Sequence, residues 1–256
     1  MPVPAGRFVW FELMTTDQAA AKAFYAAVVG WGAMDAPMPG MTYTMFTAGG
    51  TPIGGLMDLP EDARKAGAPP SWSGYVAVDD VDAAAAKAAS LGGAVHVPPT
   101  DIPEVGRFAV VADPHGAALA MIKLSSPDQP PPPPGTAGRV GWHELLAGDR
   151  ETAFAFYAAM FGWTKADAID MGEMGIYQLF AAGGEVIGGM FTKPPMIPVP
   201  FWLYYVNTGD IDAAAKRVGE AGGKIMMGPM EVPGGDWIVQ GMDPQGAAFA
   251  LVGKRG

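Results

Sequence analysis

The chain contains no cysteine among its 256 residues. This absence excludes disulfides, thiolate metal sites and a cysteine nucleophile. Because a protein without disulfides fits a reducing compartment, we expect a cytoplasmic protein. Histidine is nearly as scarce, with three residues. No segment reaches the roughly 18–20 consecutive apolar residues that a membrane-spanning helix needs. The first residues, MPVPAGRFVWFELM, lack a basic segment followed by a long apolar run, so they do not resemble a signal peptide.

Positive charge is also in deficit. The 16 lysines and arginines face 26 aspartates and glutamates, which gives a formal net charge of −10. Nucleic acid and anionic membranes are therefore excluded as general partners, because both require a basic surface. Apolar residues make up 50% of the chain and charged residues 16%, a composition that supports a large core and is inconsistent with disorder.

The sequence repeats itself. WFELMTTDQAAAKAFYAAVVGW at 10–31 matches WHELLAGDRETAFAFYAAMFGW at 142–163, with twelve of 22 positions identical, and further matched segments follow in the same order. Five consecutive prolines lie between the two copies, a composition typical of a semi-rigid spacer. The pattern predicts two homologous domains, residues 1–125 and 138–256, joined by a proline-rich linker at 126–137.

Each domain is predicted to be built from two similar parts. In the first domain, residues 7–13 have strand character, and Asp17 is placed to cap a helix that ends at Gly30. Residues 42–57 are typical of a β-hairpin, and 72–124 repeat the order of strand, helix and further strands. Each domain therefore contains two βαβββ units, and the chain contains four.

Three motifs carry a family resemblance: AAKAFYAAVVGW from Ala20 to Trp31, VDDVDAAAAKAASLGG from Val78 to Gly93, and the turn DPHG at 113–116. All three recur with substitutions in the second half. Together they resemble the vicinal oxygen chelate superfamily of glyoxalases, bleomycin resistance proteins and extradiol dioxygenases, and within it the tandem-domain branch described as glyoxalase-like. The resemblance implies an α+β fold of two tandem domains, each a pair of βαβββ units forming a partly closed barrel with a cavity.

Enzymes of that superfamily usually hold a divalent metal with histidine and glutamate side chains that point into the cavity. In the first domain, the resemblance puts the three ligand positions at Trp10, Ser73 and Ala120. In the second domain, the same positions hold Trp142, Leu203 and Ala250. Metal sites of this kind need imidazole and carboxylate ligands. We therefore expect that the usual metal ligands are lost, and that neither a divalent metal nor another cofactor is bound.

Strand alternation predicts which side chains line the cavities. Because residues i and i+2 of a strand share a face, Glu12 and Met14 point inward if Trp10 does, and Glu144 follows Trp142. The hairpins contribute a tyrosine each, and the middle strands add a serine and two tyrosines. The predicted ligand-binding residues are Trp10, Glu12, Tyr43, Ser73, Tyr75, Trp142, Glu144, Tyr177 and Tyr205.

These residues leave three interpretations open. In the first, the protein binds a small hydrophobic or cationic molecule, its predicted partner, in aromatic cavities. In the second, it is a lyase or a dioxygenase- or hydroxylase-type enzyme with a degenerate or metal-independent site, where Glu12 or Glu144 is a catalytic acid or base. In the third, it is a structural or interaction protein whose barrels are filled by their own side chains, and these glutamates hydrogen-bond tyrosine hydroxyls or backbone. The sequence allows a monomer or a homodimer.

Overall fold

The structure is a computed structural model that describes residues 5–38, 41–126, 133 and 135–256. Within these residues, two eight-stranded sheets follow the two sequence repeats, with strand orders β2-β3-β4-β1-β5-β8-β7-β6 and β10-β11-β12-β9-β13-β16-β15-β14. In both sheets, two βαβββ units meet at their first strands. This confirms the predicted α+β fold of tandem domains, and the sheets remain open instead of closing into complete barrels.

The elements of the two repeats correspond one to one except for two short helices. The first repeat contains β1 (Phe8–Thr15), α1 (Gln18–Val29), β2 (Gly32–Met38), β3 (Met41–Ala48), β4 (Thr51–Asp58), α2 (Glu61–Lys65), β5 (Ser71–Ala77), α3 (Val81–Ser90), β6 (Ala94–Ile102), β7 (Gly106–Ala112) and β8 (Ala118–Leu124). The second contains β9 (Val140–Ala147), α4 (Arg150–Phe161), β10 (Thr164–Asp170), η1 (Gly172–Met174), β11 (Ile176–Ala182), β12 (Glu185–Thr192), β13 (Phe201–Asp210), α5 (Ile211–Glu220), β14 (Lys224–Val232), β15 (Asp236–Met242) and β16 (Ala248–Lys254).

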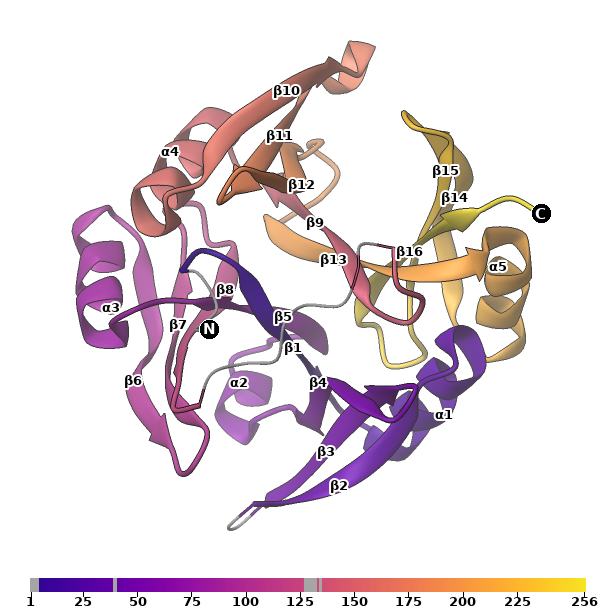
Figure 1. Ribbon diagram of the computed structural model, residues 1–256, viewed down its shortest axis with the longest axis horizontal. Coiled ribbons are helices and arrows are strands. Elements are labelled where there is room, and N and C mark those ends of the chain that lie inside the picture. Colours follow the sequence, from indigo (N-terminus) through magenta and orange to yellow (C-terminus); the bar gives the residue numbers. More distant parts are fainter. Residues whose placement is uncertain (1–4, 39–40, 127–132, 134) are drawn as a thin grey trace. The chain divides into compact units, whose positions relative to one another are not determined.

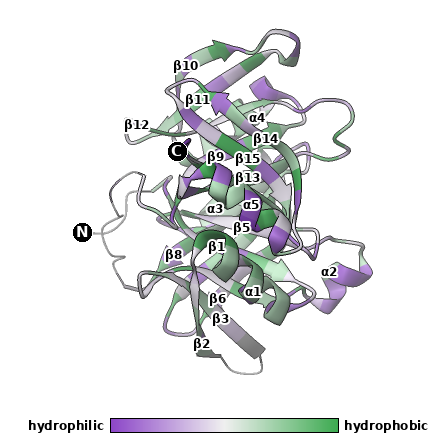
Figure 2. Ribbon diagram, turned by 90° about the vertical axis from the view of Figure 1, so that its right-hand side faces the viewer, coloured by the Kyte–Doolittle hydropathy of each residue, from purple (hydrophilic) through white to green (hydrophobic). Residues whose placement is uncertain are grey.

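Local capping explains where the helices begin and end. The Asp17 carboxylate accepts a hydrogen bond from the backbone N–H of Ala20 at 2.9 Å, as the sequence predicts for the start of α1. The helix ends at Gly30, whose φ of 74° lies in the left-handed region that favours glycine. The charged helix α2 was not predicted; it buries no side chain and stands out as hydrophilic in Figure 2. In the described part of the chain, no helix is long and apolar enough to cross a membrane.

The chain forms two compact bodies, each with contributions from both repeats. Body I comprises the described residues of Met1–Val9, Ser73–Pro131 and Trp142–Trp202, and body II those of Trp10–Trp72, Pro132–Gly141 and Leu203–Gly256. Each body therefore holds one βαβββ unit from each repeat. The domain boundaries at 1–125 and 138–256 stay a prediction, and residues 127–132 and 134 of the predicted linker lie outside the described residues.

Pairs of helices from different repeats lie side by side within each body. In body II, α1 packs against α5, and in body I, α3 packs against α4 (Figure 1). The helix-facing sides of the strands complete the core of body II, because alternate residues of β1 and β13 point toward the helices. Its buried residues are Leu13, Ala21, Phe24, Tyr25, Val28, Trp31, Phe46, Leu56, Val206, Ile211, Ala214, Val218, Val239, Ala247, Phe249 and Leu251.

A buried tyrosine links the two repeats in body II. The Trp72 indole Nε1–H donates to Tyr25 Oη at 2.8 Å, and the Tyr25 hydroxyl donates to Asp243 Oδ2 at 3.3 Å. Asp243 belongs to the DPQG turn, the counterpart of DPHG in the first repeat, and burial raises its pKa. Body I repeats the arrangement with Trp202, Tyr157 and Asp113, at 3.1 and 3.4 Å.

We expect Tyr25→Phe to lower the free energy of unfolding by about 1–3 kcal/mol, because it leaves the buried Asp243 oxygen and the Trp72 indole N–H without this hydroxyl. Tyr157→Phe should cost a similar amount in body I. Urea denaturation of both variants measures the effect. Losses below about 0.5 kcal/mol in both would show that these hydrogen bonds do not hold the repeats together.

Candidate functional site

The predicted site residues divide between the two bodies. Body II contains Trp10, Glu12, Tyr43 and Tyr205, and body I contains the others, namely Ser73, Tyr75, Trp142, Glu144 and Tyr177. The structure brings the tryptophan, glutamate and hairpin tyrosine of each repeat together within one body. The middle-strand residues belong, in each repeat, to the other body.

In body I, three of the predicted residues form a hydrogen-bonded chain, the second triad. The Trp142 indole Nε1–H donates to Tyr177 Oη at 2.8 Å, and the Tyr177 hydroxyl donates to Glu144 Oε2 at 3.0 Å. Trp142 and Glu144 lie two residues apart on β9, and Tyr177 lies on β11. Tyr177 reaches Glu144 across the intervening strand β12, because Gly189 is the β12 residue paired with Glu144.

Body II contains the same arrangement, the first triad. The Trp10 indole Nε1–H donates to Tyr43 Oη at 3.1 Å, and the Tyr43 hydroxyl is hydrogen-bonded to Glu12. Here too the strand between the two partners carries a glycine, since Gly55 of β4 pairs with Glu12. The geometry therefore includes the tyrosine–glutamate hydrogen bond that the third interpretation of the sequence expects.

The second glycine of each pair in Gly54-Gly55 and Gly188-Gly189 makes room for a triad. A Cβ atom on Gly55 would collide with the Tyr43 hydroxyl and would lie 3.2 Å from Glu12 Oε1. A Cβ atom on Gly189 would collide with the ring of Tyr177. The second glycine of each pair is therefore required because a tyrosine ring lies directly over the strand.

Burial governs the protonation of the triad tyrosines. It raises the pKa of Tyr43 and Tyr177 above the ordinary phenol value, and the neighbouring Glu12 and Glu144 carboxyl groups raise it further. Both phenols therefore remain protonated at neutral pH and act as donors. Each glutamate is 8% exposed and accepts a bond from a neutral hydroxyl. The triads thus fix a carboxylate among aromatic rings.

Methionines surround the first triad on the side of the sheet away from α1. Met14 pairs with Met57, Met45 pairs with Gly55, and Met34 pairs with Met45 in the neighbouring strands. Because paired residues share a face, these side chains flank Glu12 and Tyr43. Met34 is 46% exposed, and the other three are half-buried. We call the set the first face: Trp10, Glu12, Met14, Met34, Tyr43, Met45 and Met57.

The corresponding face in body I is lined differently. Phe191 pairs with Leu146, and Leu179 pairs with Gly189 beside Glu144. Leu146 is 3% exposed and Tyr177 is 9% exposed, so these two positions are more enclosed than Met14 and Tyr43, which are half-buried. The other apolar side chains, Trp142, Leu179 and Phe191, are half-buried. We call it the second face: Trp142, Glu144, Leu146, Tyr177, Leu179 and Phe191.

The remaining predicted residues lie on the middle strands. Tyr75 is buried next to Phe108, and Ser73 is half-buried on the same strand. Tyr205 is 2% exposed, and its hydroxyl accepts a hydrogen bond from Gln240 Nε2 at 2.5 Å. Sequence reasoning missed Gln240, because its counterpart in the first repeat is a valine and the repeat therefore gave no signal.

The residues at the family's metal positions do not fit a divalent metal. The indoles of Trp10 and Trp142 are donors only, and both donate to tyrosines. Leucine and alanine at the other positions of the second repeat offer no ligand atoms. In the ranges that the structure describes, no group of three or more histidine, cysteine, aspartate or glutamate side chains is placed to hold a metal ion.

Two of the three histidines make packing or hydrogen-bond contacts within body I. His143 is 8% exposed, its ring stacks on Phe8 with centroids 4.1 Å apart, and its Nδ1–H donates to the carbonyl of Ile187 at 2.6 Å. Burial lowers its pKa to about 4, so it is neutral at pH 7. His115 lies in the turn before β8, where Nε2 is 2.8 Å from the Thr152 hydroxyl oxygen.

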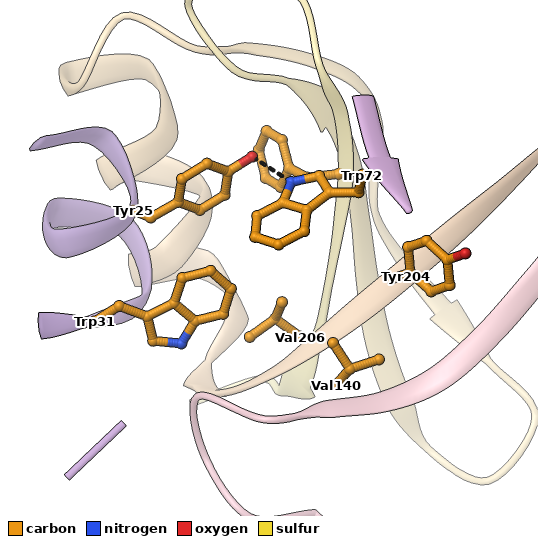
Figure 3. A pocket seen from close by; sticks show the side chains of 7 residues that line it. Tyr25, Trp31, Trp72, Val140, Tyr204 and Val206 are labelled. Atoms are coloured by element: carbon orange, nitrogen blue, oxygen red, sulfur yellow. Dashed lines mark hydrogen bonds between the residues drawn. The ribbon is translucent and has the colours of Figure 1, made fainter. Parts of the chain in front are cut away.

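A narrow pocket in body II lies on the helix-facing side of the strands (Figure 3). Tyr25 and Trp72, joined by the hydrogen bond drawn in the figure, form one part of its wall. The full lining consists of Tyr25, Trp31, Trp72, Val140, Tyr204, Val206 and Phe249. Four of these side chains belong to the buried core, so we interpret the pocket as a gap in core packing.

Comparison with known families gives a match to each repeat. The model of the Glyoxalase/Bleomycin resistance protein/Dioxygenase superfamily matches residues 7–121 and again residues 139–251. The chain is 37% identical over 246 residues to the putative glyoxylase CFP32 of Mycobacterium tuberculosis, covering 95% of this chain and 93% of that protein. It is 32% identical over 265 residues to the anthracycline biosynthesis protein DauV of Streptomyces sp. (strain C5), covering 98% and 94%.

Solved structures share the fold at low sequence identity. The Mn(II)-bound glyoxalase from Novosphingobium aromaticivorans is 19% identical with a TM-score of 0.63, and the alignment covers 100% of this chain and 83% of that chain. Homoprotocatechuate 2,3-dioxygenase from Brevibacterium fuscum, in complex with 3,4-dihydroxyphenylacetate, is 16% identical with a TM-score of 0.68, covering 100% and 82%. At these identities the similarity extends to the fold alone.

Proposed function

Because the chain belongs to the glyoxalase/bleomycin resistance protein/dioxygenase superfamily, we propose that it binds a small aromatic molecule against its first and second faces, without the family's metal ligands. One observation carries the proposal. In both repeats, a tryptophan, a tyrosine and a buried glutamate form the same hydrogen-bonded chain on the side of the sheet away from the helices. In each repeat, the strand that lies between the tyrosine and the glutamate carries a glycine, which lets the tyrosine reach the glutamate.

The chemistry of these faces suits a flat apolar ligand. Half-buried indoles on both faces and the thioethers of the first face offer polarisable surface, and aromatic rings favour stacking. The triad contributes a polar group at a fixed position, because the indole N–H holds the tyrosine hydroxyl, which in turn donates to the glutamate. A ligand with one hydrogen-bond donor or a positive charge would meet the carboxylate and rest its rings on Trp10 or Trp142.

The names of two relatives are in line with a small-molecule role. One relative is described as a putative glyoxylase and another as an anthracycline biosynthesis protein. Anthracyclines contain fused rings, and such a scaffold would suit an aromatic and methionine-lined surface. The ligand class proposed for this chain rests on its own triads, and the relatives' names support it.

A titration with three-ring probes tests the proposal. We expect acridone, which is neutral, to quench tryptophan fluorescence saturably. The double variant Trp10→Ala/Trp142→Ala should weaken binding at least tenfold, which corresponds to about 1.4 kcal/mol. Trp237→Phe is the control, because Trp237 lies on β15, stacks with Arg255 and packs against the buried core of body II instead of belonging to a triad. Equal binding by the double variant would refute the proposed site.

Metal-independent proton transfer is a second candidate function. The observation that favours it is a carboxylate held by a tyrosine hydroxyl at 3.0 Å on a ligand-facing surface, as a general acid or base requires. Turnover of a thiol hemithioacetal that persists in a chelator and disappears in Glu12→Gln/Glu144→Gln would favour this candidate. Turnover lost on chelation would instead indicate a metal.

A further inference from the structure

The two triad-bearing faces have diverged in lining, exposure and charge. Three methionines of the first face are replaced in the second: Met14 by Leu146, Met45 by Leu179 and Met57 by Phe191. We infer that the first face, around Glu12, is a site for an aromatic organic cation, whereas the second face accepts only neutral aromatic molecules. This inference rests on the proposed function and assigns a ligand class to each face.

Exposure separates the two faces. On the first face Met34 is 46% exposed, and Met14, Tyr43 and Met45 are half-buried. On the second face Leu146 and Tyr177 are 3% and 9% exposed, whereas Leu179 and Phe191 are half-buried. Methionine is unbranched and has three rotatable bonds, so it can move to fit a bulky ligand, whereas leucine and phenylalanine keep their shape. The first face is therefore the more accessible and the more adaptable of the two.

Charge favours a cation at the first face. Glu12 is 8% exposed and is hydrogen-bonded to the phenol of Tyr43, so a ligand cation would meet its carboxyl group in a weakly screened environment. The Trp10 and Tyr43 rings offer the aromatic faces that attract cations. The net charge of −10 attracts cations to the protein in general and opposes anions.

The second face has a positive charge beside it. Lys193 follows Phe191 by two residues, and its backbone N–H bonds the carbonyl of Ala147 at 2.8 Å, continuing the pairing of β12 with β9. Its ammonium donates to the carbonyl of Ile197 at 2.6 Å. The first repeat has Leu59 at the same position, with the equivalent bond to Thr15. A cation on the second face would be repelled by Lys193.

Calorimetric titration with 9-aminoacridine and acridone tests the inference, because the two probes have the same three-ring size and differ in charge at pH 7. We expect one equivalent of 9-aminoacridine and two of acridone per chain. Glu12→Gln keeps a hydrogen-bond acceptor for Tyr43. It should weaken the binding of 9-aminoacridine by a factor at least ten times larger than the factor for acridone. Glu231→Gln, an exposed change on β14, is the control that should alter neither affinity.

A second variant tests the methionines that line the first face and leaves the Glu12 carboxyl group unchanged. Met14→Leu/Met45→Leu/Met57→Phe gives the first face the corresponding residues of the second face and should weaken the binding of 9-aminoacridine at least threefold. Two equivalents of bound 9-aminoacridine, or equal effects of Glu12→Gln on both probes, would overturn the inference and leave the proposed function standing. If neither probe binds the unmodified protein, the proposed function itself is wrong.

Discussion

Gly189→Ala should lower the free energy of unfolding by about 2–6 kcal/mol. The added methyl group would occupy the position of the Tyr177 ring, so the ring must leave its place over β12. Overpacking of this kind costs about 1–3 kcal/mol, and loss of the Tyr177 bonds to Trp142 and Glu144 adds about 1–3 kcal/mol. Gly55→Ala should act in the same way on Tyr43.

Gly219→Ala is the matched control for these glycine variants. Gly219 lies in α5 with open space around its Cβ position, so alanine should raise stability by up to about 1 kcal/mol. Urea denaturation measures all three variants, and tyrosine fluorescence or near-ultraviolet circular dichroism reports the displaced ring. A loss below about 1 kcal/mol in Gly189→Ala would mean that Tyr177 does not pack against the strand as described.

Acidification should destabilise the protein through His143. Burial lowers the pKa of His143 to about 4, whereas an unfolded histidine titrates near 6.5. The folded state therefore favours the neutral ring, and the resulting stability is complete above pH 6.5 and is lost as the pH falls toward 4. The expected loss across this window is about 3 kcal/mol. Carboxylates with lowered pKa, such as Asp149, weaken the fold only at lower pH.

His143→Phe separates this effect from other titrations. Phenylalanine keeps a ring against Phe8 but leaves the Ile187 carbonyl without its donor, so the variant should be about 1 kcal/mol less stable at pH 7. Between pH 6.5 and 4 its stability should fall by about 3 kcal/mol less than that of the unmodified protein. His96→Gln, an exposed change, is the control. Parallel pH profiles for His143→Phe and the unmodified protein would contradict the account.

Much of the fold could be predicted from the sequence because it depends on short-range patterns. Asp17 and Gly30 mark the ends of α1, and alternation along β1 places Trp10 with Glu12. The internal repeat then extends each prediction to the second half. The tyrosine of each triad was also among the predicted residues, as part of the hairpin, but the pairing of β4 with β1 that brings it to the glutamate was not predicted.

Long-range pairing explains what the sequence did not reveal. Tyr25 bonds Asp243, 218 residues away, and either repeat offers an equivalent aspartate, so the partner is not encoded locally. The four methionines of the first face also went unrecognised as a group. Met34 lies on β2, a strand that was not predicted by itself, and only the register of four neighbouring strands gathers these side chains.

Methionine methyl NMR tests the central claim most directly. With 13C-methyl methionine, acridone or 9-aminoacridine stacked on the first face should shift the methyl signals of Met14, Met34, Met45 and Met57 by ring currents. Single Met→Leu variants assign these signals. Met121, which is fully buried on β8, serves as the internal control and should not shift. Unshifted signals from the first face at saturating probe, or shifts confined to other methionines, would contradict binding at the triads.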